Sequence, residues 1–256
     1  MKISAAIIAH NEEKNIKEAI ESLSFADEIV VVDSESTDRT RDLSSDAGAR
    51  VIVQEWLGFG RQKQFAVDNC ENEWIFSLDA DERVSKDLQD TILELKTRSA
   101  NELADGYRVS RLSYYMEQPI KHCGWYPDWQ LRFFDKNKGR WKDLLVHESV
   151  EMKPGARVEK LRKDILHFTI KNAAHHHQMI GERYAPLAAK QMYESGTKTS
   201  RFRVRTAGVS AFLQSYILKA GFLDGFPGFC ISKFAAHHAY LKHLLLLEIQ
   251  EKKLQE

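Results

Sequence analysis

The sequence predicts an α/β fold, in which a Rossmann-like domain with a parallel, right-handed sheet precedes a helical C-terminal region. Three observations support this prediction. Four units, each a short apolar run followed by a segment of helical periodicity, succeed one another over the first hundred residues. Polar or acidic residues follow three of the apolar runs directly, at the strand ends where parallel sheets bind ligands. From residue 172 onward only helical periodicity remains.

Composition limits the classes of protein that fit. Of the 256 residues, 43% are hydrophobic, which is enough for a sizeable core. The 37 basic and 37 acidic residues balance, so we expect no nucleic-acid partner. Three widely spaced cysteines argue against a disulfide framework and fit a reducing cytosol. No apolar run approaches the ~18 residues of a membrane span, and the N-terminal run is too short for one.

The first two strand–helix units have simple signatures. Ile3–Ala9 is a continuous apolar run, as expected for a strand buried on both faces. Asn11 is predicted to cap the helix that follows. The second strand, Glu28–Val32, ends at Asp33, and a polar helix comes next.

The third and fourth units repeat the pattern. The third strand is Arg50–Val53, and Gly58 opens the helix after it. The fourth strand, Trp74–Leu78, ends at Asp79. In the next helix the residues expected to face the core recur at helical spacing: Leu88, Ile92, Leu93 and Leu95.

After residue 100 the pattern changes to short strands and then to helices. The expected strands are Tyr107–Tyr115, Gln130–Phe134, Val146–Glu151 and Arg157–Leu161. The expected helices cover residues 172–195, 207–223 and 227–250, with a basic link at 198–205. We therefore divide the chain into a domain at 1–170 and a helical region at 171–256.

The most informative motif is LDADE at residues 78–82. Asp79 and Asp81 stand two residues apart just after a buried strand, where two carboxylates can bind one divalent cation. Aspartate pairs also occur in ordinary turns, but the position after a fourth parallel strand favours a metal site. Mg²⁺ and Mn²⁺ both suit such oxygen ligands.

A second motif, VVDSESTDRT at residues 31–40, follows the second strand. Asp33 at the strand end can accept a hydrogen bond from a nucleobase N–H or a ribose hydroxyl. Asp38 can act in the same way, or it can cap the next helix, as can Thr37.

Together with AHNEE at residues 9–13, these motifs resemble the inverting glycosyltransferases of family 2. The resemblance implies a GT-A nucleotide-diphospho-sugar transferase domain over residues 1–170. In that family the first two motifs bind the nucleobase and ribose, and the DxD motif binds the metal on the donor diphosphate. The residues implied to bind the nucleotide sugar are His10, Asn11, Glu12, Asp33, Lys63 and Asp79.

Two positions depart from the family pattern. Ser34 stands where many members have a second aspartate. The helix start GRQKQ at residues 60–64 resembles a Gly-x-x-x-Asn segment near the diphosphate, but has Gln64 in place of the asparagine. Lys63 or Arg61 can neutralise phosphate there, or lie on a solvated helix face.

The resemblance also extends to the metal shell, and the reaction that it implies needs a catalytic base. In related metal-dependent transferases a downstream histidine often completes the metal shell, so His147 is expected to join Asp79 and Asp81. An inverting transfer needs a carboxylate that deprotonates the acceptor hydroxyl. Asp128, set among aromatic side chains, is the preferred base, and Glu148 is nearly as good.

Segments Trp125–Phe134, Lys138–Val150 and Tyr216–Gly225 resemble the branch of the family that adds glucose or a related hexose to the inner core of bacterial lipopolysaccharide. This implies a hexose, glucose first, moved from a UDP-linked donor to a lipopolysaccharide-core or other lipid-linked glycan acceptor. Residues 201–247 contain six Lys or Arg, one acid and interleaved aromatics, which suits an anionic membrane surface. We therefore expect a cytoplasmic protein, peripheral on the inner face of the cytoplasmic membrane. Helices that pack on the catalytic domain or on another subunit are the alternative.

Other classes fit the motifs less well. A haloacid-dehalogenase-type phosphatase also has a DxD motif at a strand end, but its nucleophile normally ends the first core strand. A nucleotidyltransferase of related fold would need a glycine-rich loop after the first strand, where this chain has His10-Asn-Glu-Glu. A non-catalytic membrane adaptor would have no need of the acidic strand ends.

Overall fold

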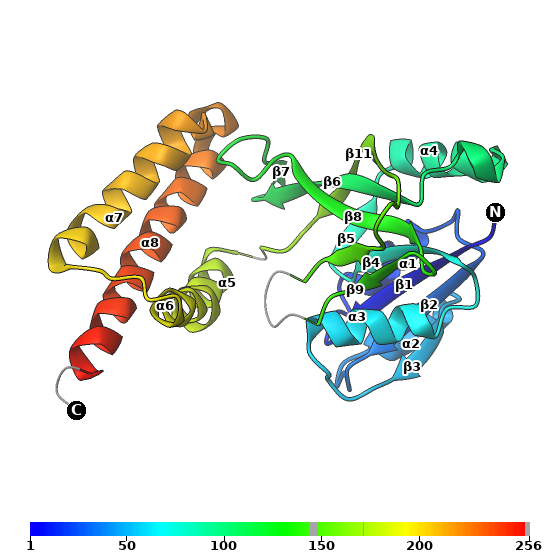
Figure 1. The fold of residues 1–256 in the computed structure, drawn as a ribbon, viewed down its shortest axis with the longest axis horizontal. Helices are drawn as coiled ribbons and strands as arrows, with labels where there is room; N and C mark the ends of the chain where they lie inside the picture. The colour runs from blue at the N-terminus through cyan, green and yellow to red at the C-terminus, as the bar shows by residue number, and fades with distance from the viewer. Residues whose placement is uncertain (144–147, 171, 254–256) are drawn as a thin grey trace. The chain divides into compact units, whose positions relative to one another are not determined.

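A computed structural model of the chain describes residues 1–143, 148–170 and 172–253 (Figure 1). The chain forms two compact units. The sheet unit consists of Met1–Leu112 and Asp128–His167, and the helical unit consists of Ser113–Pro127 and the chain from Phe168 onward. Segment 113–127 therefore packs with the C-terminal helices, although its first residues belong to the sheet strand Gly106–Tyr115.

The sheet unit is built on one mixed sheet. Within the described residues its strands follow the order β3-β2-β1-β4-β8-β6-β11-β5, and β7 pairs with β6. Their bounds are β1 Ile3–Ala9, β2 Glu28–Asp33, β3 Arg50–Val53, β4 Trp74–Asp79, β5 Glu82–Val84, β6 Gly106–Tyr115, β7 Gln118–Pro119, β8 Asp128–Asp135 and β11 Val158–His167. Strands β9 (Gly139–Trp141) and β10 (Val150–Met152) form a separate antiparallel pair.

The first four strands are parallel, as predicted. β1 pairs with β2 on one side and β4 on the other, which aligns Ala9 with Asp33 and Ile8 with Asp79. The two acidic residues therefore flank the carboxyl end of β1. The other half of the sheet is antiparallel, with β8 between β4 and β6, and the apolar runs did not predict this pairing.

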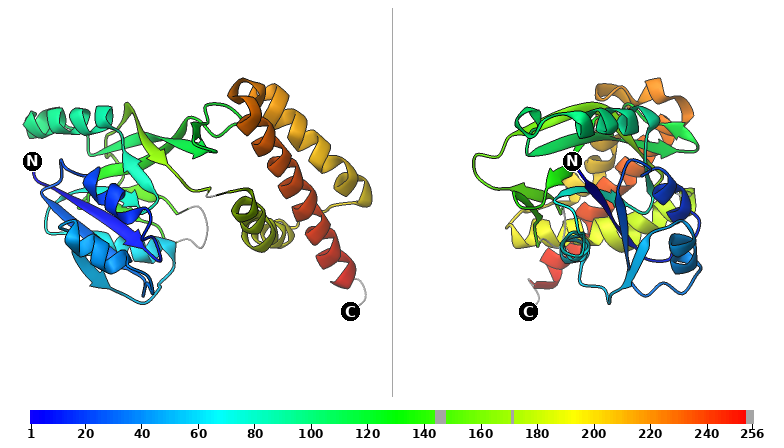
Figure 2. Two further views of the ribbon diagram at one scale, coloured as in Figure 1. Left: turned by 180° about the vertical axis from the view of Figure 1, so that it is seen from behind. Right: turned by 90° about the vertical axis from the view of Figure 1, so that its right-hand side faces the viewer.

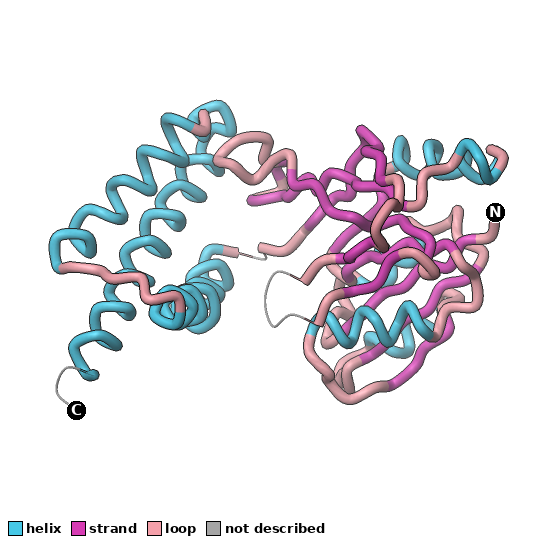
Figure 3. The backbone as a smooth tube through the Cα atoms, viewed as in Figure 1, coloured by secondary structure: helices cyan, strands magenta, loops and turns pink. Residues whose placement is uncertain are grey.

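Helices cover both faces of the parallel half (Figure 3). Their bounds are α1 Ile16–Glu21, α2 Thr40–Asp46, α3 Phe59–Asp68 and α4 Lys86–Thr97, followed by a short 3₁₀ turn, η1, Ala100–Glu102. Side chains of β1 alternate between the faces. Ile3 and Ile7 pack in one cluster with residues of α1 and α4, whereas Ala6 packs in a second cluster with Ala66 and Val67 of α3.

Two expectations about these helices are wrong. Asn11 does not cap α1, because its backbone has φ +54° and its Oδ1 accepts a hydrogen bond from Thr37 N–H at 2.8 Å. Asn15 stands at the N-cap position instead. Leu93 is 44% exposed, since the three other predicted core residues of α4 fill its buried face.

The helical unit consists of α-helices joined by short π-helical and 3₁₀ turns. Its elements are α5 Ala173–Gln178, a π-helical turn η2 Met179–Tyr184, α6 Ala185–Glu194, α7 Arg201–Leu213, a second π-helical turn η3 Gln214–Leu218, a 3₁₀ turn η4 Gly221–Asp224, and α8 Gly225–Lys253. α7 and α8 lie side by side in all views (Figure 2). None of the helices in the described part of the chain has the length and apolar character needed to cross a membrane.

Element bounds in the second half differ from those predicted. α7 begins at Arg201, not near residue 207, because Ser200 Oγ accepts from Arg203 N–H and caps the helix. The basic link is therefore helical from that point. β11 extends to His167, beyond the predicted end at residue 161. β10 begins at Val150, and the expected strand start at residue 146 lies outside the described residues.

Candidate functional site

The loops after β1 and β2 are joined by hydrogen bonds at the carboxyl end of the sheet. Asn11 N–H donates to Ser36 Oγ at 2.9 Å, and Asn11 Oδ1 accepts from Thr37 N–H. Glu12 N–H donates to Thr40 Oγ1 at 2.8 Å. These contacts fix the positions of two loops that are distant in the sequence.

Asp33 is fully buried at the end of β2. Its carboxylate accepts from the backbone N–H and the hydroxyl of Ser36, at 2.9 and 2.5 Å. The carbonyl of the next residue, Ser34, lies 2.6 Å from His10 Nδ1, and the Ser34 hydroxyl accepts from Gln62 Nε2 at 3.0 Å. Ser34, the departure from the family pattern, thus links the β2 loop to α3.

Asp38 is hydrogen-bonded to the start of α2. Its Oδ1 accepts from the N–H and the hydroxyl of Thr40, the first residue of α2, at 3.0 and 2.5 Å. Burial alone would raise the pKa of Asp38, but hydrogen bonds from Thr40 and Glu13 hold it below the ordinary value. Asp38 is therefore bonded to the first residue of α2, but it does not stand at the N-cap position that the capping alternative implied.

Asp79, the first aspartate of the DxD motif, is held by two cations. Its Oδ1 lies 2.7 Å from Lys63 Nζ, and its Oδ2 accepts from Arg132 Nη2 at 2.8 Å. Burial by itself would raise the pKa of Asp79, but the positive charges of Arg132 and Lys63 hold it well below the ordinary value. Asp79 is therefore ionised over the physiological pH range.

The ion pairs continue beyond Asp79. The same Arg132 Nη2 donates to Glu82 Oε1 at 2.8 Å, and Glu82, which has no exposed surface, also lies 3.4 Å from Arg111 Nη1. Arg111 in turn donates to Asp128 Oδ2 at 2.6 Å. Burial would lower the pKa of Arg132, but Asp79 and Glu82 raise it. Sequence reasoning missed Glu82 and Arg111 as members of the site.

Both candidates for the catalytic base belong to this cluster. Asp128 accepts from Arg111 on one oxygen and from Gln130 Nε2 on the other, at 2.7 Å. Its side chain is 33% exposed, so it remains within reach of a ligand. Glu148 Oε1 lies 3.6 Å from Lys63 Nζ.

The second aspartate of the DxD motif faces a histidine that the sequence did not single out. Asp81 Oδ2 lies 3.5 Å from His167 Nε2. His167 ends β11, where it pairs with Glu82 of β5. Because this antiparallel pairing joins distant segments, no local pattern predicts it. His147, the expected third metal ligand, lies outside the described residues.

The charge of the cluster fits a divalent cation. Its five carboxylates belong to Asp79, Asp81, Glu82, Asp128 and Glu148, and its three permanent cations are Lys63, Arg111 and Arg132. Two negative charges are therefore in formal excess. Within residues 1–143, 148–170 and 172–253, no three His, Cys, Asp or Glu side chains form a metal-binding group. Asp81 and His167 are a pair of potential metal ligands in the described residues, since their side chains face one another.

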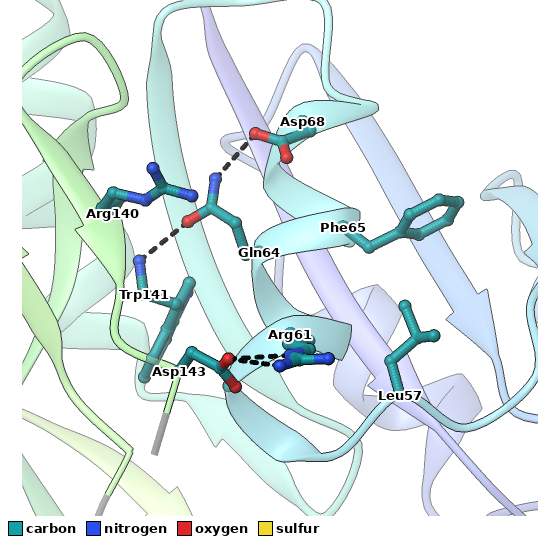
Figure 4. Close-up of a pocket in the computed structure, with 9 residues that line it drawn as sticks. Leu57, Arg61, Gln64, Phe65, Asp68, Arg140, Trp141 and Asp143 are labelled. Carbon is teal, nitrogen blue, oxygen red and sulfur yellow. Dashed lines mark hydrogen bonds and ion pairs between the residues drawn. The ribbon is translucent and has the colours of Figure 1, made fainter.

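A separate surface pocket of about 350 Å³ is lined by residues of α3 and of the segment at 140–143 (Figure 4). Its lining residues are Leu57, Gly60, Arg61, Gln64, Phe65, Asp68, Arg140, Trp141 and Asp143. Arg61 pairs with Asp143 here, and Gln64 Oε1 accepts from Trp141 N–H at 2.8 Å. The Trp141 ring contacts the acidic cluster, since Lys63 Nζ lies 4.8 Å from its centroid. Of the two candidate phosphate ligands on α3, Lys63 belongs to the acidic cluster and Arg61 does not.

Comparisons with known proteins agree with this architecture. Residues 4–164 match the family model of glycosyl transferase family 2. An uncharacterized glycosyltransferase of Rickettsia bellii is 32% identical over 267 residues, which cover 97% of this chain and 87% of that protein. The lipopolysaccharide core biosynthesis glycosyltransferase LpsC of Rhizobium meliloti is 34% identical over 255 residues, covering 94% and 90%.

A solved structure shares the fold. The mannosyltransferase PcManGT from Pyrobaculum calidifontis, determined with GDP-Man and Mn²⁺, matches with a TM-score of 0.55 and 13% identity. The match covers 96% of this chain and 87% of that one, and confirms the expected GT-A-like fold. The comparisons lend no support to a phosphatase or a non-catalytic adaptor. The chain belongs to glycosyl transferase family 2 and is a glycosyltransferase.

Proposed function

We propose that this enzyme transfers a hexose, glucose first, with inversion from a UDP-linked donor to a lipopolysaccharide-core or other lipid-linked glycan acceptor. The observation that carries the proposal is the cluster at the end of β4, where Lys63, Asp79, Arg132, Glu82, Arg111 and Asp128 alternate in charge. The similarity to LpsC, whose name assigns it to lipopolysaccharide core biosynthesis, supports the choice of acceptor.

The donor would bind across the ends of β1, β2 and β4. His10, Asn11, Glu12 and Asp33 lie in the interlocked loops and would bind the nucleoside. Lys63 and Arg132 would neutralise the diphosphate. Two further groups of the buried Arg132 guanidinium, Nε and Nη1, have no hydrogen-bond acceptor among the described residues, so they can accommodate an anionic oxygen.

A divalent cation, Mg²⁺ or Mn²⁺, would be held at the DxD motif. Asp81 and His167, which lie 3.5 Å apart, would bind it together with Asp79, and His147 would be a further ligand. The excess negative charge of the cluster supports this assignment. When bound, the ion would stabilise the negative charge that develops on the departing nucleoside diphosphate.

An inverting displacement needs one carboxylate beside the acceptor hydroxyl to take its proton. Asp128 is our first candidate, because Arg111 and Gln130 fix its orientation while a third of its side chain stays exposed. Glu148, next to Lys63, is the second candidate. In-line displacement forms no covalent intermediate, so the site needs no protein nucleophile.

Because the proposed acceptor is lipid-linked, the enzyme would act at the inner face of the cytoplasmic membrane as a peripheral protein. The helical region at 171–256 would be the part that docks. Glycosyl transfer and membrane docking are separable properties, and each has its own test.

Calorimetric titration tests the proposed reaction. The purified protein is titrated with UDP-glucose, UDP-galactose, GDP-mannose and other sugar nucleotides, in Mn²⁺ and in EDTA. We expect one UDP-hexose to bind in Mn²⁺ and to lose affinity in EDTA. Binding of a different nucleotide class would overturn the donor assignment, and equal binding in EDTA would overturn the metal assignment. Asp46→Ala, on the exposed side of α2, serves as a control that should bind like the wild type.

A further inference from the structure

We infer that the helical unit binds an anionic lipid bilayer through one defined surface, the outer face of α7 together with the turn that leads into α8. We call this surface the tip patch. It consists of Phe202, Val209, Leu213, Ile217, Leu218, Phe222, Leu223 and Phe226, all of them exposed. The inference deepens the proposed function, since it specifies how the enzyme would reach a lipid-linked acceptor, but it is tested without donor or acceptor.

One face of α7 is buried and the opposite face is exposed. Val204 and Ala207 are buried on the face that packs toward α8. Phe202, Val209 and Leu213 follow one another at spacings of seven and four, so they share the opposite face of the helix. Phe202 is 74% exposed. Large apolar side chains thus lie exposed on the side of α7 that faces away from its buried residues.

The turn between α7 and α8 continues this apolar surface. Leu218, at the end of η3, is 80% exposed, and Phe222, Leu223 and Phe226 follow it on η4 and at the start of α8. Eight large exposed apolar side chains concentrated on one helix face and the turn after it mark an interaction site, whereas scattered exposed apolar residues are ordinary.

The aromatic rings of the turn support one another. The Tyr216 ring lies 6.3 Å from that of Phe222 and 5.9 Å from that of Phe229. The rings of Phe226 and Phe229 are stacked 6.3 Å apart. These contacts hold the exposed rings in place, so little conformational entropy is lost when they enter an apolar phase. Aromatic side chains are enriched where a protein meets the bilayer interface.

The positive charge of the segment around the tip patch indicates an anionic partner. The chain as a whole is neutral, yet residues 201–247 contain six Lys or Arg and one acid, Asp224. The side chain of Asp224 is only 6% exposed, because it accepts from the backbone N–H groups of Lys121 and His122. The exposed formal charge of residues 201–247 is therefore positive, and of the six cations Arg201 is paired, with Glu251 of α8 at 3.2 Å. Lys233 Nζ lies 5.8 Å from the Phe212 ring, within the same group of aromatics.

This combination favours a lipid bilayer over a second copy of the chain. A symmetric dimer through the tip patch would bring the cations of both copies together, and repulsion between these like charges opposes it. Anionic head groups supply that negative charge over a whole surface, and the adjacent acyl region accepts the apolar side chains. Helices too short or too polar to span a membrane can bind in this interfacial way.

Vesicle flotation tests the inference with the full-length protein. We expect binding to vesicles of phosphatidylcholine with 30% phosphatidylglycerol, weak binding to phosphatidylcholine alone, and release as the salt concentration rises. The variant Leu218→Ser/Phe226→Ser should lower the partition coefficient by at least about tenfold. The matched control, Val53→Ser/Leu93→Ser, removes two exposed apolar side chains from the sheet unit and should bind like the wild type.

A second measurement locates the inserted side chain. In Phe226→Trp the indole should be quenched by phospholipids brominated on their acyl chains, whereas in Leu93→Trp the added indole should not. Each variant is compared with the wild type to subtract the signal of the five native tryptophans. This readout does not depend on how strongly a variant destabilises the fold.

Three results would overturn the inference. They are equal binding to neutral and anionic vesicles, unchanged binding of the Leu218→Ser/Phe226→Ser variant, and a dimer in sedimentation that dissociates in that variant. Sugar-nucleotide binding measured in solution without vesicles shows separately whether the proposed function holds. Normal donor binding with no vesicle binding would therefore reject the docking surface alone.

Discussion

Nη2 of the buried Arg132 lies 2.8 Å from Oδ2 of Asp79, so a permanent cation is built into the DxD site. Arg132 comes from β8, which runs antiparallel to β4 and carries the guanidinium to the carboxylate. Nζ of Lys63, from α3, lies 2.7 Å from the other carboxylate oxygen of Asp79, Oδ1. Asp79 therefore organises the positive charges of the site as well as contributing its own negative charge.

Replacing Arg132 with methionine, of similar length, should destabilise the protein. The change removes one of the two cationic partners of the buried Glu82 and of the partly buried Asp79, and losing a partner from a buried ion pair is costly. We expect a loss of roughly 3 kcal/mol in the free energy of unfolding, measured by urea denaturation. Arg61→Met is the control, because that exposed pair with Asp143 should change stability little. Equal effects of the two substitutions would contradict the assignment.

Asp81→Asn and His167→Ala should each weaken Mn²⁺-dependent donor binding at least about tenfold. The reason is that both side chains face the position proposed for the metal. Calorimetry with the UDP-sugar measures donor affinity, and thermal shift with Mn²⁺ alone measures metal binding without donor. Asp46→Asn is the matched surface control. If His167→Ala binds Mn²⁺ normally, His167 is not a ligand and His147 becomes the next residue to test.

The base is identified by comparing Asp128→Asn with Glu148→Gln. The variant that removes the base should keep its donor affinity and lose about 10²–10⁴-fold in kcat, since only proton transfer from the acceptor is affected. Steady-state transfer assays and calorimetry separate the two effects. An active Asp128→Asn enzyme with an inactive Glu148→Gln enzyme would move the role to Glu148. Loss of donor affinity in either variant would instead indicate a binding role.

His176 predicts a pH-dependent stability. Burial lowers the pKa of His176 to about 4, with a smaller contribution from the positive charge of His175. Between the ordinary pKa of about 6.5 and the folded value, the unfolded chain binds a proton that the folded protein does not. Stability therefore falls as the pH falls through this window, by up to about 1.4 kcal/mol per pH unit. His176→Phe keeps a ring against Phe234 and should flatten that slope in denaturation experiments at pH 4–7. An unchanged slope would show that His176 does not cause it.

Apolar runs and capping residues in the sequence correctly predicted the buried parallel strands and the starts of two helices. The strands ending at Ala9, Asp33 and Asp79 are continuous apolar runs, and the structure places all three side by side in parallel register. Ser85 and Gly58 mark the starts of α4 and α3, where the sequence predicted helices. Each of these signals lies within a few residues of the element that it predicts.

Asn11, Leu93 and Arg201 show where local patterns failed. Asn11 is a common capping residue, but the β2 loop offers its side chain a backbone N–H from Thr37 and so draws it away from α1. Leu93 has helical spacing, but only one face of α4 meets the sheet. The segment that begins at Arg201 has no clear helical spacing of apolar residues. The helix nevertheless begins there, because Ser200 caps it and α7 packs against α8.

By itself, the sequence determined the parallel half of the sheet, the acidic residues at its strand ends and the family to which the chain belongs. Only the tertiary structure decided which charges meet. Lys63, Asp79 and Arg132 come from three elements, and His167 reaches Asp81 through an antiparallel pairing between β11 and β5. The physical reason is that burial is encoded in the apolar pattern of each segment, whereas an ion pair depends on the path by which the chain brings distant segments together.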